Sequence, residues 1–331
     1  MVTGRMRKRR GAAILLAMLL TAVVASLSTA MLWRHWRNIE AEIAERTRLR
    51  AEWILTGALD WGRLVLSGDA GNSAVDHLDE PWAVPLAEAR LATFLAAGEN
   101  ADEVPDLDAF LSGGVEDLQA RFNLLNLTHP NSAVVDVVLQ RLFERLQLPS
   151  GEAPLLAHNL RRAWNALTAV QVEEDDVPML PQRVEQLIWL GISEDSAARL
   201  APFVSLLPTD GFTPINLNTA PEEVLYAVLI DTDRAQAQRL INLRRQTPFM
   251  SVAEAVQRAG IDGTEIQTDL LTVRSNFFEV RGALRLEGIG IEETAAVQRG
   301  GQGRRRSSVV PLWRRRSLWT PDDVIAADAN P

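Results

Sequence analysis

An uncharged apolar segment near the N-terminus constrains this chain more than any other feature. Residues 12–32 read AAILLAMLLTAVVASLSTAML and contain no acidic or basic side chain. A helix rises about 1.5 Å per residue, so a segment of this length spans the roughly 30 Å hydrocarbon core of a bilayer. We therefore predict that residues 12–32 form a transmembrane helix.

Basic residues flank this segment, and the denser cluster precedes it. Residues 1–11 carry Arg5, Arg7, Lys8, Arg9 and Arg10 and no acid. The positive-inside rule therefore predicts a cytoplasmic leader and a body on the other side of the membrane, anchored by a single span. Because the whole chain has a formal net charge of −9, the body without this cluster is more acidic still. Such a body is a poor general ligand for nucleic-acid phosphates.

A cleaved secretory signal, which would release a secreted enzyme or other soluble protein, is the alternative for this segment. Small residues at 25–27 and 28–30 offer cleavage sites. The sequence that follows argues against release, because it continues a helical pattern, with Glu42 and Arg46 spaced as an ion pair. Apolar residues recur near the spacing of one helix face at Leu32, Trp36, Ile39, Ile43, Ile54, Ala58 and Val65. We predict an amphipathic stalk helix over residues 33–66, ended by the turn-rich stretch from Gly68 to Pro85.

The leader resembles that of type IV prepilins, because RKRRG is followed at once by an apolar helix. The resemblance implies that a prepilin peptidase cuts after Gly11 and that Ala12 becomes a methylated N-terminus. Most pilins and pseudopilins carry a glutamate at the fifth mature position, where this chain has Leu16. Without that carboxylate a subunit cannot neutralise the terminal amine of a neighbour inside a filament, which suits a subunit at the filament end.

Short capped helices are predicted further along the chain. Thr219 and Glu222 have the spacing of a capping box, and Pro221 falls in the first turn, where no N–H is needed. Ser193 is predicted to cap another helix, and Ser251 and Glu254 are predicted to form a second capping box. In DLQARFNLLNLTHP, the side chains of Phe122, Leu124 and Leu127 are predicted to face a core.

The segment INLNTAPEEVLYAVL resembles two kinds of protein. One is the helix-hairpin-helix DNA-binding module of ComEA-type uptake proteins, and the other is the pseudopilin K family of type II secretion. A DNA-binding hairpin uses a glycine-rich turn whose amides meet phosphate, whereas this chain places Asp231 and Asp233 there. A membrane-anchored DNA-uptake protein is therefore the alternative function.

The resemblance to the pseudopilin K family extends over most of the chain. Besides the leader, it includes EPW at residues 80–82, the stretch 117–127, LLP at residues 206–208, and Asn216, Asn218, Thr219, Pro221 and Glu222 of the INLNTAP segment. It implies an α+β, pilin-like fold with a long N-terminal helix, a small antiparallel sheet and a large all-helical inserted domain. On this interpretation residues 67–130 begin the head, residues 131–272 form the insertion, and residues 273–331 are C-terminal strands and tail. Alternation over residues 277–288 predicts a strand, with Ser308–Arg314 pairing to it.

By this resemblance the chain is a minor pseudopilin that caps the pseudopilus tip and helps start its assembly for protein export across the outer membrane. The implied partners are the minor pseudopilins of the I and J types, the major pseudopilin, the prepilin peptidase and inner-membrane lipid, with no nucleic acid. Four histidines without HExxH spacing predict no catalytic site. No cofactor is required.

Calcium is the one metal that the resemblance suggests, because some members of the family bind it through acidic residues of the head. Calcium prefers oxygen ligands, and Glu173, Glu174, Asp175 and Asp176 offer them. A run of adjacent acids is more often a solvated loop, so both interpretations stay open.

Overall fold

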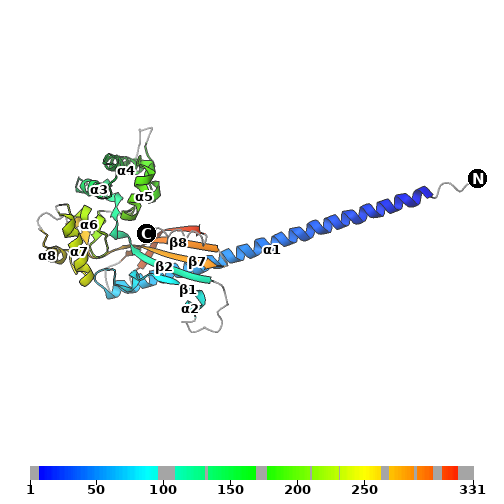
Figure 1. Ribbon diagram of the computed structural model, residues 1–331, viewed down its shortest axis with the longest axis horizontal. Coiled ribbons are helices and arrows are strands. Elements are labelled where there is room, and N and C mark those ends of the chain that lie inside the picture. Colours follow the sequence, from blue (N-terminus) through cyan, green and yellow to red (C-terminus); the bar gives the residue numbers. More distant parts are fainter. Residues whose placement is uncertain are drawn as a thin grey trace, which may run out of the picture. The chain divides into compact units, whose positions relative to one another are not determined.

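The computed structural model describes residues 7–95, 109–130, 133–168, 177–208, 211–230, 232–261, 268–286, 289–300 and 308–319. The chain divides into two compact units, residues 1–56 and residues 57–331. Helix α1 (Arg7–Asn72) begins in the first unit and ends in the second (Figure 1).

In the first unit, α1 has the length and composition needed to cross a membrane. Its most apolar window has a mean hydropathy of 2.2, and none of that window is buried. The hydroxyls of Thr21, Ser26 and Thr29 donate to carbonyls of the preceding turn at 2.8–2.9 Å. Because these hydroxyls are satisfied within the helix, they add little cost to placing it in lipid.

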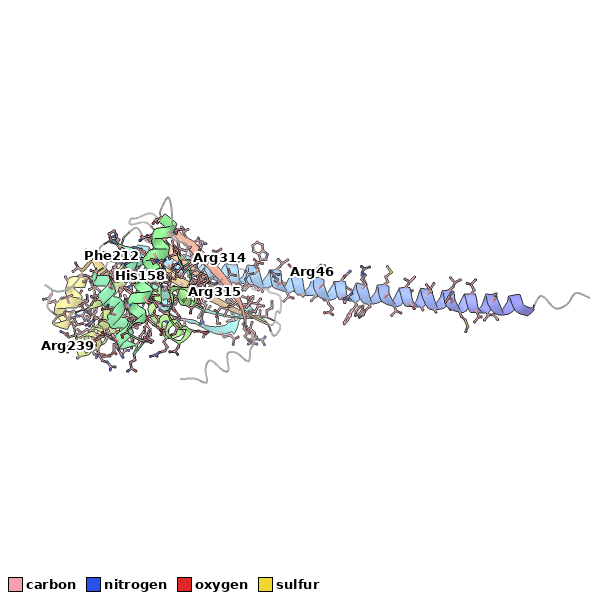
Figure 2. The ribbon with its side chains drawn as sticks, turned by 90° about the horizontal axis from the view of Figure 1, so that it is seen from above. Arg46, His158, Phe212, Arg239, Arg314 and Arg315 are labelled. Carbon is pink, nitrogen blue, oxygen red and sulfur yellow. The ribbon has the colours of Figure 1, made fainter. Side chains whose placement is uncertain are left out.

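The predicted stalk is helical. Glu42 and Arg46 pair at 2.5 Å, and Arg46 projects from this part of the helix in Figure 2. The predicted end at residue 66 is wrong, because α1 continues through Gly68 and Gly71 to Asn72. Glycine in a helix interior costs about 1 kcal/mol relative to alanine. Packing of the preceding turns against the sheet outweighs that local preference.

In the second unit, five antiparallel strands form one sheet in the order β1-β2-β7-β8-β9. The strands are β1 (Leu86–Arg90), β2 (Ala109–Asp117), β7 (Phe277–Leu286), β8 (Ile289–Gly300) and β9 (Ser308–Trp319). β7 pairs along its length with β2 on one side and with β8 on the other. The whole helical insertion therefore lies in sequence between two neighbouring strands of the sheet.

The structure confirms a strand after Asn276 and corrects the partner predicted for Ser308–Arg314. That segment belongs to β9, which pairs with β8 and not with β7. The sequence prediction lacked β8 because its central residues, Glu293 to Val297, are buried without alternation. A strand covered on both sides does not show the two-residue period on which the prediction relied.

One face of the sheet packs against the end of α1. Leu59 and Leu66 of the helix join Phe278, Val280 and Val297 of the sheet in one buried cluster. The ring of Trp82 completes it, edge-on to Phe278 at 5.2 Å between centroids.

The buried row of α1 is not the predicted one. Ala58 and Val65 are only partly buried, whereas Leu59, Gly62 and Leu66, one residue further on, face the sheet. Both rows recur at nearly the same spacing, so periodicity alone does not separate them. Gly62 decides between them, because a Cβ there would lie 2.6 Å from Val280 Cγ1, so only a residue without a side chain allows this approach.

The insertion is mostly helical and has its own core. Its helices are α3 (Ala133–Arg145), α4 (Glu152–Thr168), α5 (Glu194–Leu200), α6 (Glu222–Val228), α7 (Arg234–Gln246) and α8 (Val252–Ala259). Short 3-10 helices connect them: η3 (Leu118–Ala120), η4 (Leu124–Thr128), η5 (Val184–Leu190), η6 (Ala201–Phe203) and η7 (Thr268–Leu270). Two short parallel strand pairs join segments that are distant in the sequence: β3 (Phe122–Asn123) pairs with β4 (Val204–Ser205), and β5 (Ile215–Asn216) pairs with β6 (Leu271–Thr272). The remaining short elements of the head are η1 (Pro81–Ala83) and α2 (Leu91–Leu95).

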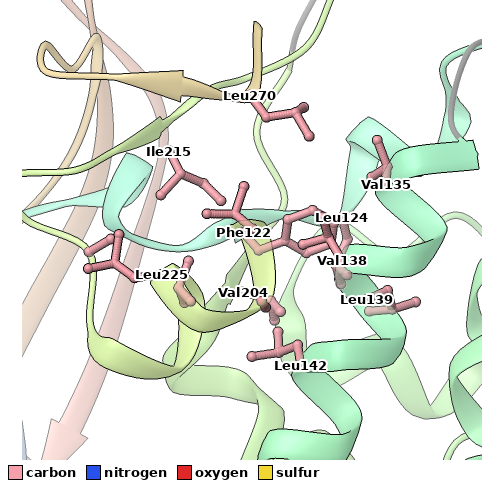
Figure 3. Packing of buried hydrophobic residues seen from close by; sticks show 14 of the residues in the cluster. Phe122, Leu124, Val135, Val138, Leu139, Leu142, Val204, Ile215, Leu225 and Leu270 are labelled. Atoms are coloured by element: carbon pink, nitrogen blue, oxygen red, sulfur yellow. The ribbon is translucent and has the colours of Figure 1, made fainter. Parts of the chain in front are cut away.

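Phe122, Leu124 and Leu127 are buried in this core, as predicted. They pack with the apolar row of α3, from Val135 to Leu142, and Figure 3 shows Phe122 and Leu124 beside Val138. Residues 122–127 thus belong to the core of the insertion, which therefore begins earlier than the predicted boundary at residue 131.

The predicted caps at Ser193 and Ser251 are confirmed, but the capping box is not formed, because Glu254 Oε2 accepts from the Met250 N–H and not from that of Ser251. The hydroxyl of Ser193 accepts from the Ser196 N–H at the start of α5, and that of Ser251 accepts from the Glu254 N–H at the start of α8. Each side chain satisfies one of the free amides in the first turn of its helix.

We predict that Gly62→Ala is less stable than Gly57→Ala by about 1–3 kcal/mol, the usual cost of overpacking. Both changes replace a helical glycine with alanine, so the difference in helix propensity cancels. A Cβ at residue 57 meets nothing within 4 Å, whereas one at residue 62 meets the stiff side chain of Val280. Denaturant unfolding of the full chain in detergent would measure the difference. Equal stability of the two variants would contradict this account of the helix–sheet contact.

Candidate functional site

Buried polar residues gather where the sheet, the end of α1 and the INLNTAP segment meet. We call this group the polar hub and define it as Asp76, Asp117, Asn216, Thr219, Ser275 and Arg299, all of which are 7% exposed or less. They come from five separate stretches of the sequence. A buried polar group is costly unless it is hydrogen-bonded, so each of these residues requires its partners in place.

Asp117, the last residue of β2, accepts four hydrogen bonds. Its Oδ2 accepts from Thr219 Oγ1 and Ser275 Oγ, both at 2.6 Å, and from Asn216 Nδ2 at 3.1 Å. Its Oδ1 accepts from the Gln119 N–H at 2.8 Å. One carboxylate thus joins the sheet to both ends of the segment that contains α6–α8.

Asp76 forms the second centre of the hub, in the connection that follows α1. Arg299 Nη2 donates to both of its carboxylate oxygens at 2.6 Å, and the Ser275 N–H donates to Oδ2 at 2.7 Å. Arg299 also donates to Asp69 at 3.0 Å and lies over the ring of Phe278. Charge-assisted bonds with two acceptor oxygens are the strong kind, so this pair fixes the end of α1 to β8.

The two asparagines of INLNTAP extend the hub in opposite directions. Asn216 Nδ2 donates to the Asp76 carbonyl and to Ser275 Oγ as well as to Asp117. Asn218 exchanges two hydrogen bonds with the backbone of Phe249, at 2.9 and 3.0 Å. The first asparagine therefore holds the sheet junction, and the second holds the turn before α8.

The predicted capping box at Thr219 and Glu222 is wrong. The N-cap of α6 is Pro221, which makes no side-chain cap, and the hydroxyl of Thr219 is directed to Asp117 instead. The side chain of Glu222 pairs with Arg234 at 2.7 Å and with Arg145 at 3.4 Å. The helix begins two residues later than predicted, so Thr219 is not at its N-cap, and its hydroxyl donates a charge-assisted hydrogen bond to the buried carboxylate.

Three carboxylates near the hub have ligand atoms within 4.8 Å of one another: Asp69, Asp76 and Glu80. Arg299 already binds two of them, and Glu80 Oε2 accepts from Trp82 Nε1 at 2.8 Å. The geometry of the group is that of an ion-pair network with its own cation. The predicted calcium ligands Glu173, Glu174, Asp175 and Asp176 lie outside the described residues.

The processing positions predicted from the leader lie in α1. Gly11 is helical, and Ala12 and Leu16 are exposed on the helix surface, with Leu16 58% exposed. No carboxylate stands at residue 16 to meet a neighbouring amine. Cleavage after Gly11 and methylation of Ala12 stay predictions.

The electrostatics of the hub depend on burial. Burial raises the pKa of Asp117 to about 6, although hydrogen bonds from Ser275, Thr219 and the Gln119 N–H act to lower it. Burial also raises the pKa of the half-buried Asp69 to about 6, assisted by Glu80 and Asp76 and opposed by Arg299. Both acids therefore bind protons more readily in the folded chain than in the unfolded one.

We predict that Thr219→Val destabilises the chain by about 1–3 kcal/mol, because Asp117 then loses a buried hydrogen-bond donor. Thr219→Ser, which keeps the hydroxyl, should restore most of that loss. Thr168→Val is the matched control: its hydroxyl is exposed at the end of α4, and the change should stay within about 0.5 kcal/mol. Unfolding midpoints would measure all three variants, and equal effects of the two valine changes would refute the role given to Thr219.

We further predict that the free energy of unfolding rises as the pH falls from 7.5 to 5.5. A raised folded-state pKa means that the proton stabilises the fold, and a pKa of about 6 for Asp117 corresponds to about 1 kcal/mol at pH 5.5. Asp69, whose pKa is also raised to about 6, acts in the same direction. Asp117→Asn should flatten the profile. A stability that falls steadily over this range in the unmodified chain would contradict the prediction.

Comparison with known proteins gives consistent results over the sequence. Residues 120–209 and residues 215–274 each match the family described as "Type II secretion system (T2SS), protein K". The type II secretion system protein K of Pseudomonas aeruginosa is 27% identical over 325 residues, which cover 91% of this chain and 92% of that protein. The corresponding protein of Klebsiella pneumoniae is 26% identical and covers 78% of this chain and 82% of its own length.

A solved structure has the same fold. One chain of the crystal structure of the GspK–GspI–GspJ complex, from the type 2 secretion system of enterotoxigenic Escherichia coli, aligns with a TM-score of 0.62. The alignment covers 83% of this chain and 98% of that chain, at 21% sequence identity. It confirms the pilin-like α+β fold, with a long apolar helix, a small antiparallel sheet and a helical insertion. By its relatives along nearly its whole length, and by the two matches within its head, the chain belongs to the type II secretion system protein K family.

Proposed function

We propose that this chain is a minor pseudopilin that caps the tip of a type II secretion pseudopilus and helps to start its assembly. The observation that carries the proposal is the whole-length likeness to protein K relatives in a chain that combines an apolar N-terminal helix with an enlarged head. Its partners on this proposal are minor pseudopilins of the I and J types, as in the solved complex, together with the major pseudopilin.

The first unit supports a membrane anchor that also packs against other helices. Leu15, Leu19 and Leu27 are each more than 60% exposed, and a continuous apolar surface of this kind requires lipid or the helices of neighbouring subunits. We place the leader in the cytoplasm and the head in the periplasm, following the charge asymmetry about the span. The hydrocarbon side chain of Leu16 suits a subunit with no further subunit above it.

The arginines of the insertion weigh against the DNA-binding alternative. Arg141 donates to the carbonyls of Tyr226, Leu229 and Thr232 at the end of α6. Arg258 and Arg239 donate in the same way at the ends of α7 and α8, and Figure 2 places Arg239 on this part of the head. Guanidinium groups used as helix C-caps are not free to neutralise phosphate.

The turn between α6 and α7 also lacks the features of a phosphate site. The carboxylate of Asp233 caps α7 by accepting from the Gln236 N–H. The side-chain oxygen of Gln236 in turn accepts from the Asp233 N–H. The chain's own carboxylate thus occupies the helix N-terminus where a phosphate would bind. The comparisons give no support to a DNA-uptake protein, and we attribute no chemical step to the chain.

We predict that the mature chain begins with N-methylated Ala12 when it is produced with a prepilin peptidase, as N-terminal sequencing or mass spectrometry would show. Gly11→Val should block processing, because a branched side chain obstructs the cleaved bond. Gly4→Val, in the same leader, should process normally. A mature N-terminus beyond Ser28, or processing of Gly11→Val at the normal rate, would remove the prepilin interpretation.

A further inference from the structure

An open groove lies where the insertion meets the sheet. Its volume is about 320 Å³. Phe277 lines it from β7, on the face opposite that of the neighbouring Phe278, which packs toward α1. Apolar walls come from Pro208, Phe212 and Pro214. We call this feature the junction groove.

The polar side chains of the junction groove are all uncharged amides or hydroxyls. Gln119 and Thr213 are bonded within the chain, to the Pro214 carbonyl and to Asn123. Asn276 and Gln298 are exposed, and neither side-chain amide has a hydrogen-bond partner among the described residues. Two amides are therefore free to bind a ligand.

The strand register connects the groove to β9, which is the outermost strand of the sheet among the described residues. The strand register sets Phe277 opposite Gln298, and Gln298 opposite Val310 of β9. Residues directly opposite in an antiparallel pair share a face, so these three form a row from the groove to the outermost strand. Val310 is 53% exposed, and Trp313 lies further along β9 at 36%. An exposed apolar surface thus extends the groove outward.

The charged residues of β9 do not offer a site for anions. Arg314 and Arg316 both pair with the buried Glu293, and Arg315 pairs with Glu185 of the insertion at 2.9 Å. Figure 2 shows Arg314 and Arg315 in this part of the head. These cations are paired inside the chain, and the residues that the structure describes in the lining carry no charge, so they offer no counter-charge to a phosphate, a carboxylate or a metal ion.

The chemistry that remains fits polypeptide. An amide side chain both donates and accepts, as a peptide group does, and proline and phenylalanine walls accept an apolar side chain. The volume is at the lower end for ligand sites, which suits a short anchoring segment at the rim of a larger protein contact. A groove that opens onto a sheet edge suits an extended segment.

We propose that the junction groove binds an extended, uncharged segment of an adjacent minor pseudopilin of the I or J type. This inference rests on the proposed function and adds to it the surface by which the head recognises a neighbour. Asn276 and Gln298 bind the backbone of that segment, and one of its apolar side chains lies between Phe212 and Phe277.

Charge placed in the groove tests the inference. The full chain and full-length I- and J-type pseudopilins of the same secretion system would be mixed in detergent, and their affinity measured. Gln298→Arg should weaken binding about tenfold or more, because the guanidinium would be buried without a partner. Gln140→Arg makes the same change on an exposed residue of α3 and should leave the affinity unchanged.

The outcomes distinguish failure of the junction groove as the docking surface from failure of the proposed function. Equal affinity of the Gln298→Arg variant and the unmodified chain overturns the groove as the docking surface while leaving the proposed function intact. Failure of the unmodified chain to bind either pseudopilin overturns the proposed function, and the inference with it. A photo-reactive residue at position 298 should cross-link to the I or J subunit, and one at position 140 should not. Absence of the first cross-link also counts against the groove, without depending on the arginine change.

Discussion

The structure of the head depends on hydrogen bonds to two buried carboxylates, those of Asp117 and Asp76. Neither is stable away from water without several donors, and the donors come from β8, from the INLNTAP segment and from the residues just before β7. Loss of a single partner from a buried charged pair typically costs about 3–5 kcal/mol. The hub therefore keeps the sheet, the end of α1 and the insertion in one arrangement.

Arginine side chains elsewhere in the head are also paired with acceptors of the same chain. Arginines that look like a basic surface in the sequence are directed inward, to helix carbonyls in the insertion and to Glu293 and Glu185 beside β9. Two surfaces among the described residues are apolar or amide in character and suit contacts with other proteins: the exposed helix of the first unit and the junction groove of the second.

Features set by neighbouring residues could be predicted from the sequence, and features set by distant ones could not. The apolar span, the caps at Ser193 and Ser251, and the core positions Phe122, Leu124 and Leu127 follow from local pattern. Thr219 was misassigned because its partner, Asp117, is 102 residues away. The Asp76–Arg299 pair gave no signal at all, since an aspartate in a turn and an arginine at a strand end are ordinary surface patterns. The buried row of α1 required knowledge of Val280.

The pairing of β2 with β7 affects when the sheet can form during synthesis of the chain. The ribosome completes β2 long before β7, and the two meet only after the residues between them have been made; Asp117 and Ser275 alone are 158 positions apart. All residues of the insertion precede β7 in the chain, so they are made before the central strand of the sheet. Phe277, Gln298 and Val310 belong to the last three strands of the sheet, so a partly synthesised subunit does not yet have the junction groove.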